Sequence, residues 1–464
     1  MAASALANSA PPVRYGRIIF LIAFTQLIVT SDFLMISVTL PSIGRDFAVP
    51  PNLLSWVIAA NALTFAGFMT VGGRLGDLFG RRSCFLAGTG LFALASLGSA
   101  ASAGLDMLIA MRALQGIGTA LLAPANFSLL NTLLPEGAVR NRAFGIFGMV
   151  QGGSLFLGLL LGGMLTTALG WRAVFVLNIP LIAVIAWLAW RVVPPVAARA
   201  TGRSIDLPGA ILVVIATALL IRSLSAMAEF GWASPRGLGF VASGLAAFGV
   251  FFLVESRVRD PLLPLAVFRY PNVVGANIVT LCTVAGAGGL FVVLSIYLQR
   301  VLGYSAMMSG LGLMPYAVGI LLGGHLSSRG MDRWPLRVNM LTGTAVSSVS
   351  LLLFQMLSRE RGYAANFPMA EILVATGTIF GLVASQAAAT RAIPPDRQGV
   401  GSALQLMAQQ IGTALGTSLA LSVMASAVGR GGDTPYRAAL LVSSGLVGAA
   451  FLAALLLTRS RSSA

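Results

Sequence analysis

Lysine is absent from this chain, and histidine occurs once. All 30 basic residues are arginines, and the two cysteines, Cys84 and Cys282, lie far apart in or near apolar runs. That spacing favours neither a disulfide framework nor a metal site. Charged residues make up 9% of the chain, against roughly 25% in soluble domains. The composition therefore excludes an ordinary soluble protein.

Apolar runs fill most of the sequence: 57% of the 464 residues are hydrophobic, and the mean hydropathy is +0.88. A membrane-spanning helix needs about 20 mostly apolar residues. We therefore predict an all-α polytopic membrane protein with 14 transmembrane helices. The expected spans are 17–40, 54–74, 83–103, 106–132, 142–168, 172–193, 207–228, 237–256, 271–299, 306–328, 336–357, 367–390, 400–427 and 437–458.

The arginines test this count and predict its orientation. A net charge of +16 could indicate nucleic acid binding in a soluble chain, but here all the arginines except Arg112 are assigned to segments between spans. With the N-terminus inside, 20 arginines fall on inner segments and 9 on outer ones, as the positive-inside rule requires. We expect a multi-pass protein of the cytoplasmic membrane with both termini cytoplasmic. The first run is too long for a cleavable signal peptide.

Weak internal sequence similarity predicts two related halves. The segment LLPEGAVRNRAFG (133–145) resembles AIPPDRQGVGSA (392–403), and GGRLGDLFGRR (72–82) has a fainter partner in GGHLSSRGMDRW (323–334). Transporters are often built from such repeats around a central site. We predict a six-helix bundle in residues 1–193, a linker with two additional helices in 194–265, and a second six-helix bundle in 266–464.

The charged stretch GGRLGDLFGRRSCF (72–85) interrupts two apolar runs. Its glycines allow close helix approach, and its charged residues lie where an inner loop is expected. We consider it a candidate conformational latch between bundles, although an ordinary positive-inside loop would explain the same composition. The latch candidates are Gly73, Asp77, Gly80, Arg81 and Arg82.

Several motifs together resemble one family. GRLGDLFGRR resembles the loop motif of the major facilitator superfamily between its second and third spans. RALQGIGTA (112–120) is similar to a motif of its fourth span, and SDFLMISVTLPSI (31–43) to the first-span signature of its 14-span drug:proton antiporters. GWRAVFVLNIP (170–180) and YLQRVLGYSAMMSGLGLMP (297–315) extend the resemblance in register. It implies the major facilitator fold and multidrug or antibiotic efflux.

Asp32 is the leading candidate for proton coupling. It lies about 21 Å into the first expected span at 1.5 Å per residue, where a carboxylate costs a few kcal/mol or more. Burial disfavours a carboxylate's charged form, so we expect Asp32 to carry a proton or to bind a cationic substrate. A structural carboxylate satisfied by neighbouring helices is the alternative.

Arg112 lies at a similar depth on the fourth span, about 10 Å from the outer end, where Asp32 is about 13 Å from it. We predict that Arg112 modulates the proton affinity of Asp32, directly or through water. Gln115 shares its helix face, and the resemblance implies a role for both in proton coupling. Arg112 could instead reach outward to Asp106 as an anchor.

Two departures from the family pattern affect the expected cavity. Leu159 occupies a position where these antiporters usually have proline, which leaves the direction of coupling open. Asn61 replaces the usual tyrosine, so we regard Asn61 and Gln115 as candidates for the substrate cavity. Glycines at helical spacing predict close helix packing; these are Gly116, Gly158, Gly162 and Gly163.

We therefore expect proton-coupled efflux of small amphipathic compounds by a monomer in the lipid bilayer, with no cofactor beyond protons and no nucleic acid partner. No phosphate-binding loop motif is present to suggest ATP as the energy source. Export of one endogenous metabolite, or import, stays open. A membrane-embedded enzyme lacks support because no nucleophile, base or ligand cluster is evident. Glu371, near the outer end of its span, could be a second acid, but we leave it out of the candidate site.

Overall fold

The computed structural model describes residues 15–134, 138–194, 206–231, 234–258, 261, 265, 269–356, 367–391, 398–427, 429 and 432–458. These residues are helical almost throughout, as the apolar runs predict. In the first half the helices are α2 (Tyr15–Asp46), α3 (Pro51–Phe79), α4 (Arg81–Ala100), α5 (Leu105–Leu133), α6 (Ala138–Leu169) and α7 (Arg172–Val192).

A hairpin of α8 (Leu207–Phe230) and α9 (Pro235–Glu255) follows. The second half contains α10 (Pro271–Arg300), α11 (Ala306–Gly312), α12 (Met314–Arg333), α13 (Leu336–Leu352), the short 3₁₀ helix η3 (Leu353–Met356), α15 (Pro368–Arg391), α16 (Gln398–Ser426) and α17 (Thr434–Leu457).

Local sequence signals begin and end these helices. Prolines occupy the first turn of several, where a missing N–H costs nothing. The side chains of Asp206, Ser234 and Ser305 accept backbone N–H groups at the starts of α8, α9 and α11. Glycines with positive φ separate neighbouring helices: Gly80 at 87° between α3 and α4, and Gly170 at 85° between α6 and α7.

Within the described residues, twelve helices are long and apolar enough to cross a membrane. In that count α11 and α12 form one span, Ala306–Met331. The expected number of 14 is therefore not established. The two helices outside the twelve are α6 and α16, which are 32 and 29 residues long.

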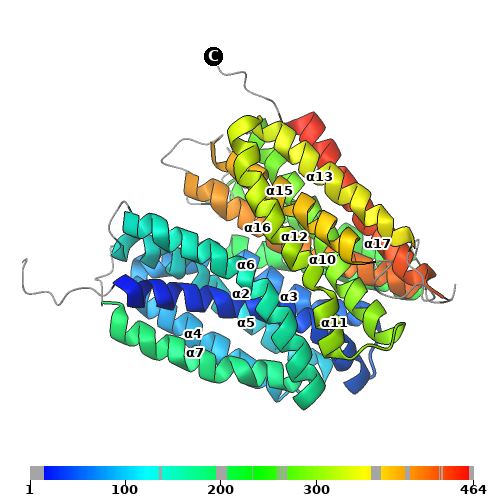
Figure 1. Cartoon of the computed structure of the whole chain (residues 1–464), viewed down its shortest axis with the longest axis horizontal. Helices are drawn as coiled ribbons and strands as arrows, with labels where there is room; N and C mark the ends of the chain where they lie inside the picture. The colour runs from blue at the N-terminus through cyan, green and yellow to red at the C-terminus, as the bar shows by residue number, and fades with distance from the viewer. Residues whose placement is uncertain are drawn as a thin grey trace, which may run out of the picture.

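The helices of each half pack in the same pattern. In the first half α5 packs on α3 and α4, α2 on α6, and α4 on α7. In the second half α15 packs on α12 and α13, α10 on α16, and α13 on α17. The two pairs of similar segments, 133–145 with 392–403 and 72–82 with 323–334, fall at the junctions of helices that correspond in these two sets. Figure 1 shows the set from α2 to α7 beside the set from α10 to α17.

The two sets contact each other through α3 with α16 and α6 with α11. The α8–α9 hairpin packs its α8 against both α3 and α16, so it touches both sets. At the Asp46 end of α2 the contact is close. The Gln299 side chain of α10 donates to the Val38 carbonyl (3.0 Å), and the Met307 backbone donates to Thr167 (2.9 Å). We call this contact of α2 and α6 with α10 and α11 the seam.

Candidate functional site

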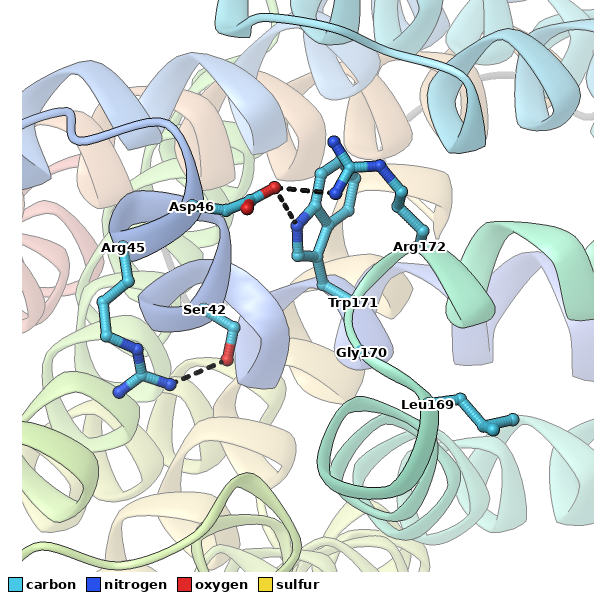
Figure 2. A pocket seen from close by; sticks show the side chains of 7 residues that line it. All are labelled: Ser42, Arg45, Asp46, Leu169, Gly170, Trp171 and Arg172. Carbon is cyan, nitrogen blue, oxygen red and sulfur yellow. Dashed lines mark hydrogen bonds and ion pairs between the residues drawn. The ribbon is translucent and has the colours of Figure 1, made fainter.

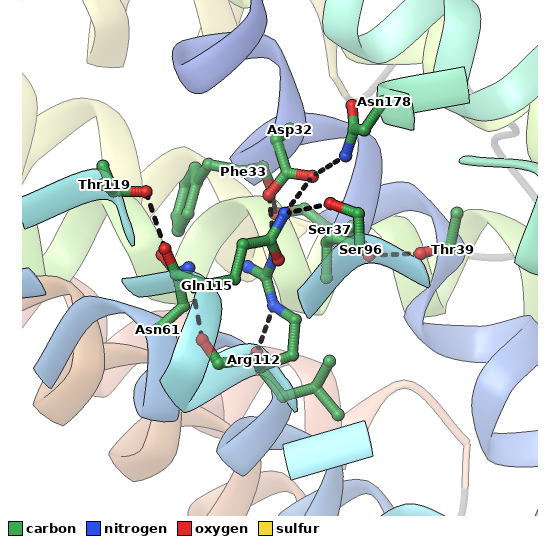
Figure 3. A network of polar contacts seen from close by, with 12 residues as sticks. Asp32, Phe33, Ser37, Thr39, Asn61, Ser96, Arg112, Gln115, Thr119 and Asn178 are labelled. Carbon is green, nitrogen blue, oxygen red and sulfur yellow. Dashed lines mark hydrogen bonds and ion pairs between the residues drawn. The ribbon is translucent and has the colours of Figure 1, made fainter. Parts of the chain in front are cut away.

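Asp32 lies in the middle of α2 with 3% of its surface exposed. Arg112 from α5 donates to its Oδ2 at 2.7 Å, and Asn178 from α7 donates to its Oδ1 at 2.7 Å. Gln115 from α5 also donates to Oδ1, at 3.2 Å. Figure 3 shows these side chains converging on the carboxylate. Three donors therefore replace the water that a carboxylate would otherwise bind.

Arg112 is fully buried and makes its ion pair inside the first set of helices. Its Nε donates to the Val57 carbonyl of α3 at 3.0 Å, and its Nη1 also donates to the Gln115 side chain. Its Nη2 has no partner in the part of the chain that the structure describes. The guanidinium therefore turns toward Asp32 rather than outward to Asp106, and removing either partner would leave a buried charge uncompensated.

The backbones of α3 and α5 approach closely enough to hold this pair. A methyl group at Gly116 would overlap the Thr64 hydroxyl and the Asn61 carbonyl. The half-buried Asn61 side chain donates weakly to the Arg112 carbonyl, at 3.4 Å. Of the two cavity candidates, Gln115 is fully buried and engaged with Asp32, so it lines no open space in this conformation.

Sequence reasoning missed Asn178 and Ser96. Asn178 lies two residues before Pro180 in the apolar helix α7, and the lone amide in this run is the one sequence signal that marks it. Ser96 of α4 accepts a hydrogen bond from Gln115 at 3.2 Å and orients that amide. Four helices, α2, α4, α5 and α7, thus supply the polar network around Asp32.

The glycines of α6 lie where two helices approach it. A side chain at Gly158 or Gly162 would press on α2 at Ser31 and Met35, and one at Gly163 would stand 2.6 Å from the Ala306 carbonyl of α11. Between them, the Leu159 carbonyl lies against Gly310 of α11. The position where the family pattern has proline is therefore part of the seam.

The latch candidates lie at the junction of α3 and α4. Gly80 ends α3 and precedes α4 with its positive φ, and Gly73 lies near Pro124 of α5. Arg82 donates to the Trp190 carbonyl at the end of α7, at 2.7 Å. Arg81 also takes part in an interaction. The side chain of Asp77 lies outside the described residues.

At the opposite end of the first set, a shallow pocket of about 410 Å³ lies between the end of α2 and the start of α7 (Figure 2). Arg172 and Trp171 both donate to Asp46 there, at 2.7 and 3.0 Å. Arg172 also stacks over the Trp171 ring and bonds the Ser102 carbonyl. Because the ion pair is partly exposed, it contributes little to stability and mainly joins three loops.

A larger hollow, about 660 Å³, lies at the Tyr15 end between α2 and α6. Its volume falls within the range of small-molecule pockets, roughly 300–1,000 Å³, and its lining is mostly apolar. The described residues contain no group of three or more histidine, cysteine or acidic side chains able to hold a metal.

Comparison with known sequences identifies the family. The chain matches the Major Facilitator Superfamily over residues 22–417 and 276–464. It belongs to the Major Facilitator Superfamily. It is 35% identical to the puromycin resistance protein pur8 of Streptomyces alboniger, covering 91% of this chain and 84% of that protein. It is 34% identical to the cephamycin export protein CmcT of Amycolatopsis lactamdurans, covering 86% and 83%.

A third relative is the lincomycin resistance protein of Streptomyces lincolnensis, 31% identical over 97% of this chain and 92% of that protein. Among solved structures, a peptide transporter POT in complex with sulfate aligns with a TM-score of 0.69 and 16% identity, over 95% of this chain and 93% of that one. A D-xylose-proton symporter aligns with a TM-score of 0.65 and 16% identity, over 96% and 97%. These structures share the fold, and membership of the superfamily points to a transporter rather than an enzyme.

Proposed function

We propose that this protein exports small amphipathic compounds, such as antibiotics or dyes, in exchange for protons. The names of its relatives, which include resistance and export proteins for puromycin, cephamycin and lincomycin, support the export of drug-like molecules. The observation that carries the proton-coupling part is the buried pair of Asp32 and Arg112. Membrane carboxylates of this kind usually mark a proton or substrate pathway.

The architecture that we propose has 14 spans, with α6 and α16 as the fifth and thirteenth. Residues 1–193 and 266–464 form the two six-helix bundles, and 194–265 carry the additional hairpin. The repeated packing pattern supports this division, and the arginine distribution supports cytoplasmic termini. The protein acts as a monomer in the cytoplasmic membrane and needs no cofactor besides protons.

In this orientation the seam closes the outer end, and the hollow between α2 and α6 lies at the inner end. The molecule then faces inward with Asp32 paired to Arg112. A proton on Asp32 removes the counterion of Arg112, whose remaining acceptors are Gln115 and the Val57 carbonyl. Protonation therefore rearranges the contact between α2 and α5 and links proton binding to the movement of the bundles.

The latch at the α3–α4 junction biases which way the bundles face. Gly80 permits the tight turn there, and Arg82 ties the start of α4 to the end of α7. The membrane potential supplies about 2.3 kcal/mol per charge per 100 mV, which is enough to drive export against a concentration gradient. Export of a single endogenous metabolite would use the same machinery.

Transport in proteoliposomes tests the proposed function. The purified chain is reconstituted, a pH gradient is imposed, and uptake of a panel of antibiotics and a fluorescent cationic dye is followed. We expect accumulation of at least one compound that depends on the gradient and collapses with a protonophore. Accumulation that is indifferent to the protonophore, or absent for every compound, would contradict multidrug antiport. Gradient-driven uptake of one metabolite alone would favour the single-substrate alternative.

A further inference from the structure

Glu371 is a buried acid that the Asp32 network does not use. Among the described residues, the buried acids are Asp32, Asp206, Glu255 and Glu371. Asp206 and Glu255 lie together at the ends of α8 and α9, and Asp32 has Arg112. Glu371, in the first turn of α15, has none of its surface exposed. It is the buried acid of the second set of helices.

Neither carboxylate oxygen of Glu371 has a hydrogen-bond partner in the described part of the chain. Its neighbours in the sequence, Phe367, Ala370 and Val374, all belong to the main apolar core. The backbone N–H of Tyr316, in the first turn of α12, faces the carboxyl group. Close packing of α12 on α15 places it there, since a side chain at Gly319 would overlap the Ile372 carbonyl.

No hydrogen bond or ion pair joins Glu371 to another element in the described structure, and the charged groups at the start of α17, Asp433 and Arg437, act on Tyr297. From α12 comes the buried ring of Tyr316, which packs edge to face against Phe291 of α10. From α10 the ring of Tyr297 packs on Phe367, one turn earlier. η3 contributes the buried Phe354. An ionised carboxylate buried without a counterion costs several kcal/mol, so this closed environment accommodates the neutral acid.

Glu371 is connected to the seam through Tyr316 at the start of α12. Tyr316 follows the short helix α11 by four residues, and α11 meets α6 through Gly310 against Leu159 and Ala306 against Gly163. Separation of α11 from α6 would uncover the start of α12. Water would then reach Glu371 from the seam side, where it would stabilise the charged carboxylate.

We propose that Glu371 is a second proton-binding site, which takes a proton from water on the seam side and must be neutral for the seam to close. The proton leaves a hydronium ion in that water and forms an O–H bond with the carboxylate; it returns to the same water when the seam reopens at high pH. This inference rests on the proposed alternating-access transport, where it makes closure of the outer end depend on a proton from outside.

Distance measurement across the seam tests the proposal without any substrate. Spin labels are placed at Leu169, an exposed residue at the end of α6, and at Met308, an exposed residue in α11. The labelled chain has Cys84 and Cys282 replaced by alanine. In reconstituted protein we expect the label distance to lengthen as the pH is raised. With Glu371→Gln we expect the short distance at every pH. A Glu371→Gln protein that keeps the unaltered pH response would overturn the proposal.

Two further variants keep the result interpretable. Glu255→Gln, the same neutralisation at a buried acid far from the seam, is expected to leave the response unchanged. Glu371→Asp retains a carboxyl group on a shorter side chain, so we expect the label distance still to change with pH, but with the midpoint of that change at a different pH. If Glu371→Gln fails to fold, an unshifted midpoint in Glu371→Asp would count against the proposal. Loss of the response in Asp32→Asn alone would assign it to Asp32. Because the distance measurement uses no substrate, it still tests the role of Glu371 if the protein proves not to export drugs.

Discussion

At the scale of single residues, the account depends on how one carboxylate is compensated inside an apolar bundle. Asp32 receives hydrogen bonds from Arg112, Gln115 and Asn178, and the charged guanidinium lies at 2.7 Å. Each donor offsets part of the cost of removing the carboxylate from water, and an ion pair at this depth is stable only with such additional partners. The donors are therefore as much a part of the site as the ion pair.

Asn178→Ala is expected to weaken the site without removing either charge. It leaves Oδ1 of Asp32 with Gln115 as its donor, and a hydrogen bond to a charged group contributes about 1.5–3 kcal/mol, or roughly 10- to 100-fold in an equilibrium constant. We expect gradient-driven transport in proteoliposomes to fall at least about tenfold at a fixed pH, from the lower end of that range. The matched control is Asn277→Ala, because Asn277 donates to Val273 of its own helix. Equal rates for the two variants would show that Asn178 is not part of the site.

At the scale of elements, α6 packs against two different helices through residues only one turn apart. Gly158 and Gly162 give it close contact with α2, while Gly163 and the Leu159 carbonyl meet α11. The contact with α2 lies within one set of helices, and the contact with α11 joins the two sets. Residues on one helix thus divide between packing within one set and a contact between the two sets, which opens in the proposed transport cycle.

Gly310→Ala is expected to shift the protein toward the conformation with an open seam. The added methyl group would overlap the Leu159 carbonyl. Overpacking costs about 1–3 kcal/mol, which changes the ratio of closed to open molecules by roughly 5- to 100-fold. A cysteine at Leu159, in a chain without Cys84 and Cys282, should react several times faster with a membrane-impermeant maleimide. Gly324→Ala in α12, where no atom lies within 4 Å, is the control and should leave the labelling rate unchanged. A rate in Gly310→Ala equal to this control would contradict the role of the seam.

At the scale of the whole molecule, two equivalent sets of helices differ in their chemistry. The first holds its buried acid in an ion pair, and the second holds Glu371 without a counterion in the described residues. The α8–α9 hairpin packs on α3 and α16, one helix from each set. The repeated packing pattern thus supports two related bundles that hold their buried acids in different environments.

Periodicity and depth made part of this arrangement predictable. Counting 1.5 Å per residue along two spans placed Asp32 and Arg112 at the same level, and their contact follows once α2 and α5 are neighbours. Asn178 could not be assigned, because an amide's partner depends on how α7 rotates against α2. Glu371 was considered as a second acid and left out, because its position near the outer end of a span does not reveal the packing by α12 and the core that buries it. The number of spans rests on α6 and α16, which fall outside the twelve candidate spans of the described residues.

Asp32→Asn provides the most direct test of the central claim that the carboxylate of Asp32 exchanges protons between the two sides. The substitution keeps the size of the side chain and its hydrogen-bonding capacity but cannot take up a proton. In proteoliposomes we expect the variant to bind its substrate and to exchange it without a gradient, yet to lose pH-driven accumulation and proton movement. If Asp32→Asn still accumulates substrate at the unaltered rate while consuming the pH difference, Asp32 is not the coupling group and the mechanism fails.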